Sequence, residues 1–144
     1  MAKQYNKSSQ NNSEAYRQLA EIEGTVPPQA VELEQAVLGA LMLEKDAIID
    51  VQEYIKPETF YTEEHRIIFQ AIQELSFEMK AIDLYTVTEC LKSHRQLTKV
   101  GGAAYLAQLT QRVASAAHIE FHAKIIAQKY VQRELIRSAT EIER

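Results

Sequence analysis

A single cysteine, Cys90, limits the covalent and metal chemistry available to this chain. One thiol cannot form an internal disulfide, and a structural zinc site made of four cysteines is excluded. A secreted domain held together by disulfides is therefore not encoded. The cysteine count favours an intracellular protein, and we expect it to be cytoplasmic.

Glycine is also scarce, and the four glycines are not placed for nucleotide binding. Gly24, Gly39, Gly101 and Gly102 fit neither GxxxxGK[ST] nor GxGxxG, the two spacings whose backbone amides enclose phosphate groups. We therefore expect no ATP chemistry, no catalytic residue and no cofactor-binding residue within these 144 residues.

Long apolar runs and clustered positive charge are absent as well. No apolar run approaches the roughly 20 residues that a membrane span needs, and the N-terminus lacks the apolar segment of a signal peptide. The formal net charge is −4, whereas proteins that bind duplex DNA usually carry clustered Lys and Arg. The sequence therefore disfavours a membrane protein and a helical transcription factor.

Two histidines give only a weak indication of a metal site. His118 and His122 are four residues apart and share one face of a helix, which suits two ligands of a metal. Glu120 stands in the wrong position for HExxH, and no third ligand is evident. We therefore predict no metal site and interpret the pair as a polar strip on a helix.

The first 24 residues are polar and have little to bury. They are rich in Asn, Gln, Ser, Glu and Lys, and Leu19 and Ile22 are their only leucine or isoleucine residues. This composition predicts a disordered tail over residues 1–24. Pro27 and Pro28 exclude an incoming helix, so the folded part is expected to begin at about residue 25.

Helical periodicity dominates the next part of the chain, and alternating runs and hairpin turn dipeptides are absent. Asp46, Thr62 and Asp83 are suitable N-cap residues. We therefore predict an all-α protein whose compact helical bundle covers residues 25–114. The expected helices are Leu33 to Met42, Asp46 to Ile55, Thr62 to Leu75, Asp83 to Leu91 and Ala103 to Val113.

Residues 115–144 are expected to form one long helix. Ser115 is a suitable N-cap, and no Gly or Pro occurs from Ala116 to Arg144. At about 1.5 Å per residue such a helix reaches roughly 43 Å, which exceeds the width of a domain of about 100 residues. Part of the helix is therefore expected to project and to present its apolar positions to a partner.

Four residues on this helix are the candidate interface. Ile126 and Tyr130 continue an apolar stripe, and Arg133 and Arg137 lie one turn apart beyond them. Buried Tyr and Arg often concentrate the binding energy of an interface. We expect the four to contribute to association rather than to the domain's own core. In the alternative, the helix folds back on its own domain, Ile126 and Tyr130 close the bundle, and both arginines are solvated.

Five segments in order also carry a resemblance to a known family. They are VPPQAVELEQAVLGALML (Val26 to Leu43), FYTEEHRIIFQAI (Phe60 to Ile72), IDLYTV (Ile82 to Val87), VGGAAYLAQL (Val100 to Leu109) and SAAHIEFHAKII (Ser115 to Ile126). The chain from Val26 to about Ile142 resembles the amino-terminal domain of bacterial DnaB-type replicative DNA helicases.

The resemblance implies a domain that precedes a RecA-like motor in a hexameric helicase, which unwinds duplex DNA at the bacterial replication fork. ATP and Mg²⁺ are expected for that motor, not for this chain. In the family the domain ends in a helical hairpin that builds a collar as a trimer of dimers and offers a surface to the primase C-terminal domain. A helicase loader is a further expected partner.

Ala116 to Arg144 resembles the first arm of that hairpin, and the second arm, the linker and the motor are expected to lie outside this chain. The interface residues Ile126, Tyr130, Arg133 and Arg137 would then serve self-association or primase binding. A stand-alone helical adaptor, or a helicase-loader or primosome component that shares this domain, has the same residue pattern and stays an alternative.

Overall fold

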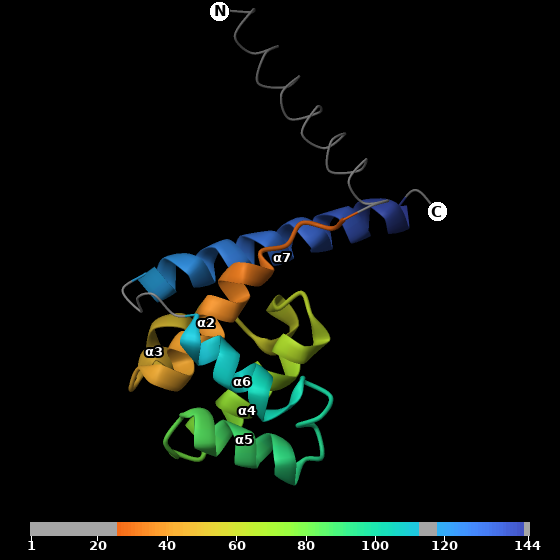
Figure 1. Ribbon diagram of the computed structural model, residues 1–144. Helices are drawn as coiled ribbons and strands as arrows, with labels where there is room; N and C mark the ends of the chain where they lie inside the picture. The colour runs from red at the N-terminus through yellow and green to blue at the C-terminus, as the bar shows by residue number, and fades with distance from the viewer. Residues whose placement is uncertain (1–25, 113–117, 143–144) are drawn as a thin grey trace, which may run out of the picture. The chain divides into compact units, whose positions relative to one another are not determined.

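The computed structural model describes residues 26–112 and 118–142, and within these ranges it contains α-helices, one short 3-10 helix and no strand (Figure 1). The all-α prediction is therefore confirmed. The elements are α2 (Val31–Leu43), α3 (Ala47–Val51), η1 (Pro57–Thr59), α4 (Glu63–Phe77), α5 (Leu84–Ser93), α6 (Gly102–Gln111) and α7 (Ile119–Ile142). The predicted tail of residues 1–24 and the expected N-cap Ser115 lie outside the described residues.

The chain divides into two compact units, which are described separately. One unit is Gln29–Tyr130, and the other combines Met1–Pro28 with Val131–Arg144. The first unit contains the helices from α2 to α6 and the first half of α7. The second unit contains the second half of α7 and, among the described residues, the segment 26–28.

Helix α2 is the centre of the first unit, because α3, α4, α5 and α6 all contact it (Figure 1). Its side chains are apolar on nearly every side from Val37 onward, and Val37, Leu38 and Leu41 are at most 1% exposed. The remaining helices complete one continuous core that includes Phe69 of α4 and Leu106 of α6. The helix expected from Leu33 to Met42 lies within α2 and forms the centre of this core.

Side-chain caps begin α4 and α5 at two of the predicted residues. The Thr62 hydroxyl oxygen accepts a hydrogen bond from the His65 backbone N–H at 3.2 Å. Asp83 Oδ1 accepts one from the Thr86 N–H at 2.8 Å, and the Thr86 hydroxyl oxygen accepts from the Asp83 N–H in return. The bonds from the His65 and Thr86 N–H groups satisfy first-turn amides that have no partner inside the helix.

Asp46 does not cap α3, so the prediction for this residue was wrong. Its backbone has φ 62°, which is left-handed, and its side chain makes no cap hydrogen bond. The cap geometry requires an extended backbone that aims the carboxylate at the first turn. The helix is also shorter than expected, since it ends at Val51 rather than at Ile55.

Helices α4 and α5 end in the same way, each with a left-handed residue that is not glycine. Met79 has φ 57° and Arg95 has φ 58°. The Lys80 N–H donates to the Leu75 carbonyl at 2.9 Å, and the Gln96 N–H donates to the Leu91 carbonyl at 2.8 Å. This is the Schellman pattern, which stops a helix by satisfying its last carbonyls.

Gly101 immediately precedes α6 and has φ 110°, and a Cβ atom at this position would lie 2.9 Å from Tyr105 Cβ. The glycine therefore permits both the left-handed turn and the close approach of the Tyr105 side chain. The helix expected from Ala103 to Val113 begins one residue earlier, at Gly102, and ends at Gln111.

The first half of α7 belongs to the core of the Gln29–Tyr130 unit. Ile119, Ala123 and Ile126 are 6%, 0% and 1% exposed, and they share one helix face. None of the described helices combines the length and the apolar character that crossing a membrane requires.

Candidate interaction surface

The four predicted interface residues do not lie in one environment. Ile126 and Tyr130 belong to the Gln29–Tyr130 unit, and Arg133 and Arg137 belong to the second unit. Ile126 is 1% exposed and packs into the core. The expectation that Ile126 serves an interface rather than the domain's own core is therefore wrong, because it shares the buried face of Ile119 and Ala123.

Tyr130 is partly buried, and Arg133 and Arg137 bind groups of their own unit. Arg133 Nη1 donates a 2.9 Å hydrogen bond to the Pro28 carbonyl oxygen. Arg137 Nη2 lies 2.8 Å from Glu134 Oε2, and its side chain is 68% exposed. The interface roles of Tyr130, Arg133 and Arg137 stay predictions.

An apolar stripe is exposed along the second half of α7. Val131 is 54% exposed and Leu135 is 51% exposed, and Ala139 is exposed one turn further on. The spacing i, i+4, i+8 places the three on one helix face. The sequence predicted that this helix presents apolar positions to a partner, but Val131, Leu135 and Ala139 were not among the four candidate interface residues.

A buried polar network joins α2, α4 and α6 in the first unit. Glu34 and His65 are both 1% exposed, and His65 Nδ1 lies 2.8 Å from Glu34 Oε1. His65 Nε2 lies 2.6 Å from the Tyr105 hydroxyl, and the Tyr61 N–H donates to Glu34 Oε2 at 2.9 Å. Sequence reasoning missed this network because its members are 31 and 40 residues apart.

One arrangement of protons satisfies the whole network. An ionised Glu34 carboxylate only accepts, so His65 Nδ1 carries the proton between them. His65 Nε2 then accepts from the Tyr105 O–H, and the Tyr105 oxygen accepts from Gln35 Nε2 at 3.3 Å. No buried side-chain polar atom of the described residues lacks a partner, so the network stabilises the packing of three helices.

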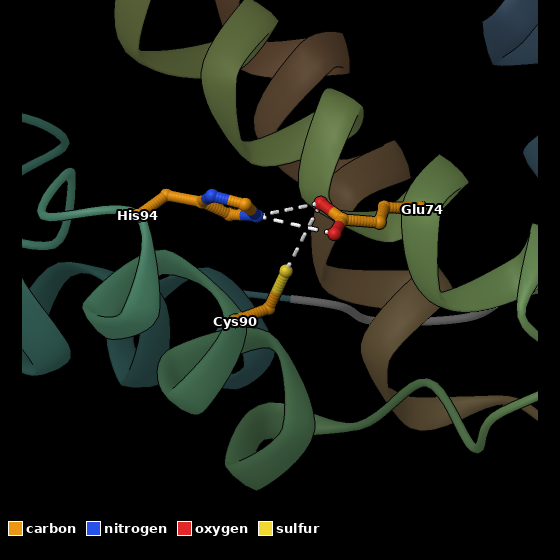
Figure 2. A group of neighbouring side chains, drawn as sticks. All are labelled: Glu74, Cys90 and His94. Atoms are coloured by element: carbon orange, nitrogen blue, oxygen red, sulfur yellow. Dashed lines mark hydrogen bonds and ion pairs between the residues drawn. The ribbon is translucent and has the colours of Figure 1, made fainter.

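A second polar cluster lies between α4 and α5 (Figure 2). His94 Nε2 lies 2.8 Å from Glu74 Oε2 and 3.1 Å from Glu74 Oε1, and Cys90 Sγ lies 3.6 Å from Glu74 Oε2. Burial and, after it, the negative charge of Glu74 raise the pKa of the Cys90 thiol to about 11. The spacing of Cys90 and His94 is visible in the sequence, whereas the approach of Glu74 is not.

The chain is similar to replicative DNA helicases in its sequence. It is 52% identical over 110 residues to the replicative DNA helicase DnaB of Rhodothermus marinus, an alignment that covers 76% of this chain and 12% of that protein. It is 43% identical over 117 residues to the DnaB of Geobacillus stearothermophilus, which covers 81% of this chain and 26% of that protein. The chain thus spans only a small part of these relatives.

Solved structures agree with this similarity. The crystal structure of the N-terminal domain of DnaB helicase from Mycobacterium tuberculosis superposes with a TM-score of 0.79 at 38% identity, and the match covers 81% of this chain and 85% of that one. A DnaB-like replicative helicase, studied for its interactions with primase, superposes with a TM-score of 0.70 at 26% identity over 78% of this chain and 26% of that one.

Residues 26–128 match the family described as DnaB-like helicase N terminal domain. These residues include the central helix α2, the capped helices α4 and α5, and the first half of α7. The chain belongs to the DnaB-like helicase N terminal domain family.

Proposed function

We propose that this chain is the collar domain of a hexameric, ATP-dependent replicative DNA helicase, where it supports oligomerisation and binds the C-terminal domain of primase. The observation that carries the proposal is the match to helicase N-terminal domains across residues 26–128, together with a fold that covers 85% of one such solved domain. We expect no catalytic group from the chain itself. Unwinding, ATP hydrolysis and Mg²⁺ binding belong to the motor of the parent protein.

The exposed stripe on α7 supports an association role. Val131 and Leu135 expose about half of their side chains, and they repeat at the spacing through which two helices pack. Gln132 and Ser138 lie three residues before and after Leu135, so they border the stripe with polar side chains. An apolar centre with a polar rim is the usual composition of a protein interface.

The parent helicase would act in the cytoplasm as a trimer of dimers, and a helicase loader would place it on DNA. The solved structure of a DnaB-like replicative helicase that resembles this chain concerns that helicase's interactions with primase. This supports primase as the partner. Tyr130, Arg133 and Arg137 are our candidate contact residues together with Val131 and Leu135. A stand-alone adaptor or loader component stays the alternative.

The experiment measures binding of the primase C-terminal domain to the purified chain by calorimetry, and chain mass by light scattering. We expect saturable binding, and we expect Val131→Ser/Leu135→Ser to reduce primase affinity or self-association. Phe77→Ser is the matched control, since Phe77 is 91% exposed on the other unit. Absence of primase binding, with an unchanged mass for the double variant, would contradict the proposal.

A direct reading of the coding sequence separates the helicase from the adaptor. A phosphate-loop motor encoded in frame after Arg144 is expected if the parent is a helicase. A stop codon at that point would favour the stand-alone adaptor.

A further inference from the structure

Three potential metal ligands converge between α4 and α5, outside the surface discussed above (Figure 2). Glu74 comes from the last turn of α4, Cys90 from α5, and His94 from the residue that ends α5. Their ligand atoms all lie within 4.8 Å of one another, and this is the one such group among the described residues. Two helices therefore supply one oxygen, one sulfur and one nitrogen to a common point.

The distances fit a tetrahedral cation. With metal bonds of about 2.0–2.3 Å, a tetrahedral zinc site separates sulfur from oxygen by roughly 3.6 Å and nitrogen from oxygen by roughly 3.3 Å. The Cys90 Sγ to Glu74 Oε2 distance is 3.6 Å. His94 Nε2 lies 2.8 Å from the same oxygen, Glu74 Oε2, so these two atoms have to move apart by about 0.5 Å when the cation binds.

We propose that Glu74, Cys90 and His94 bind a divalent cation of the zinc class. Thiolate, imidazole and carboxylate together select zinc over magnesium and calcium, which prefer oxygen ligands alone. Binding releases the thiol proton of Cys90, and any proton on His94, to solvent. The cation replaces the hydrogen bonds that Glu74 now makes with both partners.

Space for a further ligand adjoins the site. A cavity of about 270 Å³ is lined by Gln70, Ala71, Glu74, His94 and Gln96. Water can therefore reach the cation and complete its coordination. The Glu74 and His94 side chains are 41% and 48% exposed, so the cation exchanges with solvent, and its affinity is expected to be micromolar rather than that of a closed structural site. It connects the C-terminal turns of α4 and α5 and stabilises their packing.

The test uses the untagged, metal-free 144-residue chain and Co²⁺ as the spectroscopic probe. We expect one Co²⁺ per chain, with the visible bands of tetrahedral cobalt and a thiolate-to-cobalt charge-transfer band. Zn²⁺ should displace the cobalt and raise Tm. Cys90→Ser should abolish the charge-transfer band, and Glu74→Gln and His94→Gln should each weaken binding more than about tenfold.

Matched controls separate this site from other carboxylates and histidines. Glu78→Gln removes an exposed acid near the end of α4, and His122→Gln removes one histidine of the pair on α7. Both should leave the cobalt spectrum and the affinity unchanged. Because Glu74 and His94 are surface residues, their variants are expected to fold, which circular dichroism checks. A wild-type spectrum without the charge-transfer band, or affinity unchanged in Glu74→Gln and His94→Gln, would overturn the proposal.

Discussion

The Tyr54 hydroxyl donates a 2.9 Å hydrogen bond to Glu120 Oε1 and so joins the turn after α3 to the first half of α7. Lys124 Nζ lies 5.2 Å from the centre of the same ring. The hydrogen bond to Glu120 is the main cause that raises the pKa of Tyr54, and desolvation adds to it. The contact therefore has a measurable dependence on pH.

Tyr54 should ionise above its ordinary pKa of 10.0. A raised pKa means that the stabilising contribution is complete below pH 10.0 and is lost as the pH rises through the folded-state pKa. The difference in tyrosinate absorbance between the native chain and Tyr54→Phe should give a midpoint above 10.0. Glu120→Gln should move that midpoint down, and an unchanged midpoint would contradict this assignment.

His65→Ala should lower the free energy of unfolding by about 1–3 kcal/mol or more, because Glu34 Oε1 and the Tyr105 hydroxyl both lose their hydrogen bond to His65. Denaturant titration measures the change. His94→Ala, measured in the metal-free chain, is the control, since that histidine is half exposed and its loss should change stability by less than about 0.5 kcal/mol. If His65→Ala lowers the free energy of unfolding no more than His94→Ala does, the contact between His65 and Glu34 does not stabilise the fold.

Leu41→Ala should lower the free energy of unfolding by about 2–5 kcal/mol, since this side chain is 1% exposed at the centre of the unit. Leu43→Ala is the matched control two residues along the same helix. Leu43 is 54% exposed, and its truncation should have an effect within about 0.5 kcal/mol. Similar losses for both would show that α2 is not the centre of the core.

Local signals were sufficient for most of the fold. The caps at Thr62 and Asp83 could be predicted because a cap needs one of a few side-chain types at one position, and helix α2 could be predicted from the spacing of its apolar residues. The ends of α4 and α5 could not be predicted, because Met79 and Arg95 occupy left-handed positions where the usual marker is glycine. The N-cap prediction for Asp46 was wrong because Asp suits both an N-cap and a left-handed turn.

Asp83→Ala should destabilise the domain by about 1 kcal/mol, because it removes the hydrogen bond to the Thr86 N–H. Asp46→Gly should be neutral or stabilising, since Asp46 has φ 62° and makes no cap bond. Thermal unfolding of both variants gives the comparison. A larger loss at Asp46 than at Asp83 would contradict the cap assignment.

Arg133→Ala should loosen the segment at Pro27 and Pro28, because it removes the 2.9 Å hydrogen bond to the Pro28 carbonyl. Limited proteolysis near residues 26–30 should accelerate. Arg137→Ala is the control, since Arg137 binds Glu134 within its own helix. If both variants are cut at the native rate, the contact does not order this segment.

The candidate surface was less predictable than the fold, and Ile126 shows why. Periodicity placed Ile126 and Tyr130 on one stripe but did not reveal where the core stops covering that stripe. The structure puts Ile126 inside the core, whereas Val131 and Leu135, on a different face of α7, are about half exposed. Which side chains remain uncovered depends on contacts between segments that are far apart in sequence.

The network of Glu34, His65 and Tyr105 restricts how this domain can change during evolution. Each residue comes from a different helix, and replacing one leaves buried polar atoms of another without a partner. Replacing all three by apolar residues of similar volume removes that penalty. Tolerated substitutions at these positions should therefore occur together, so that the residues at these three positions change as a set.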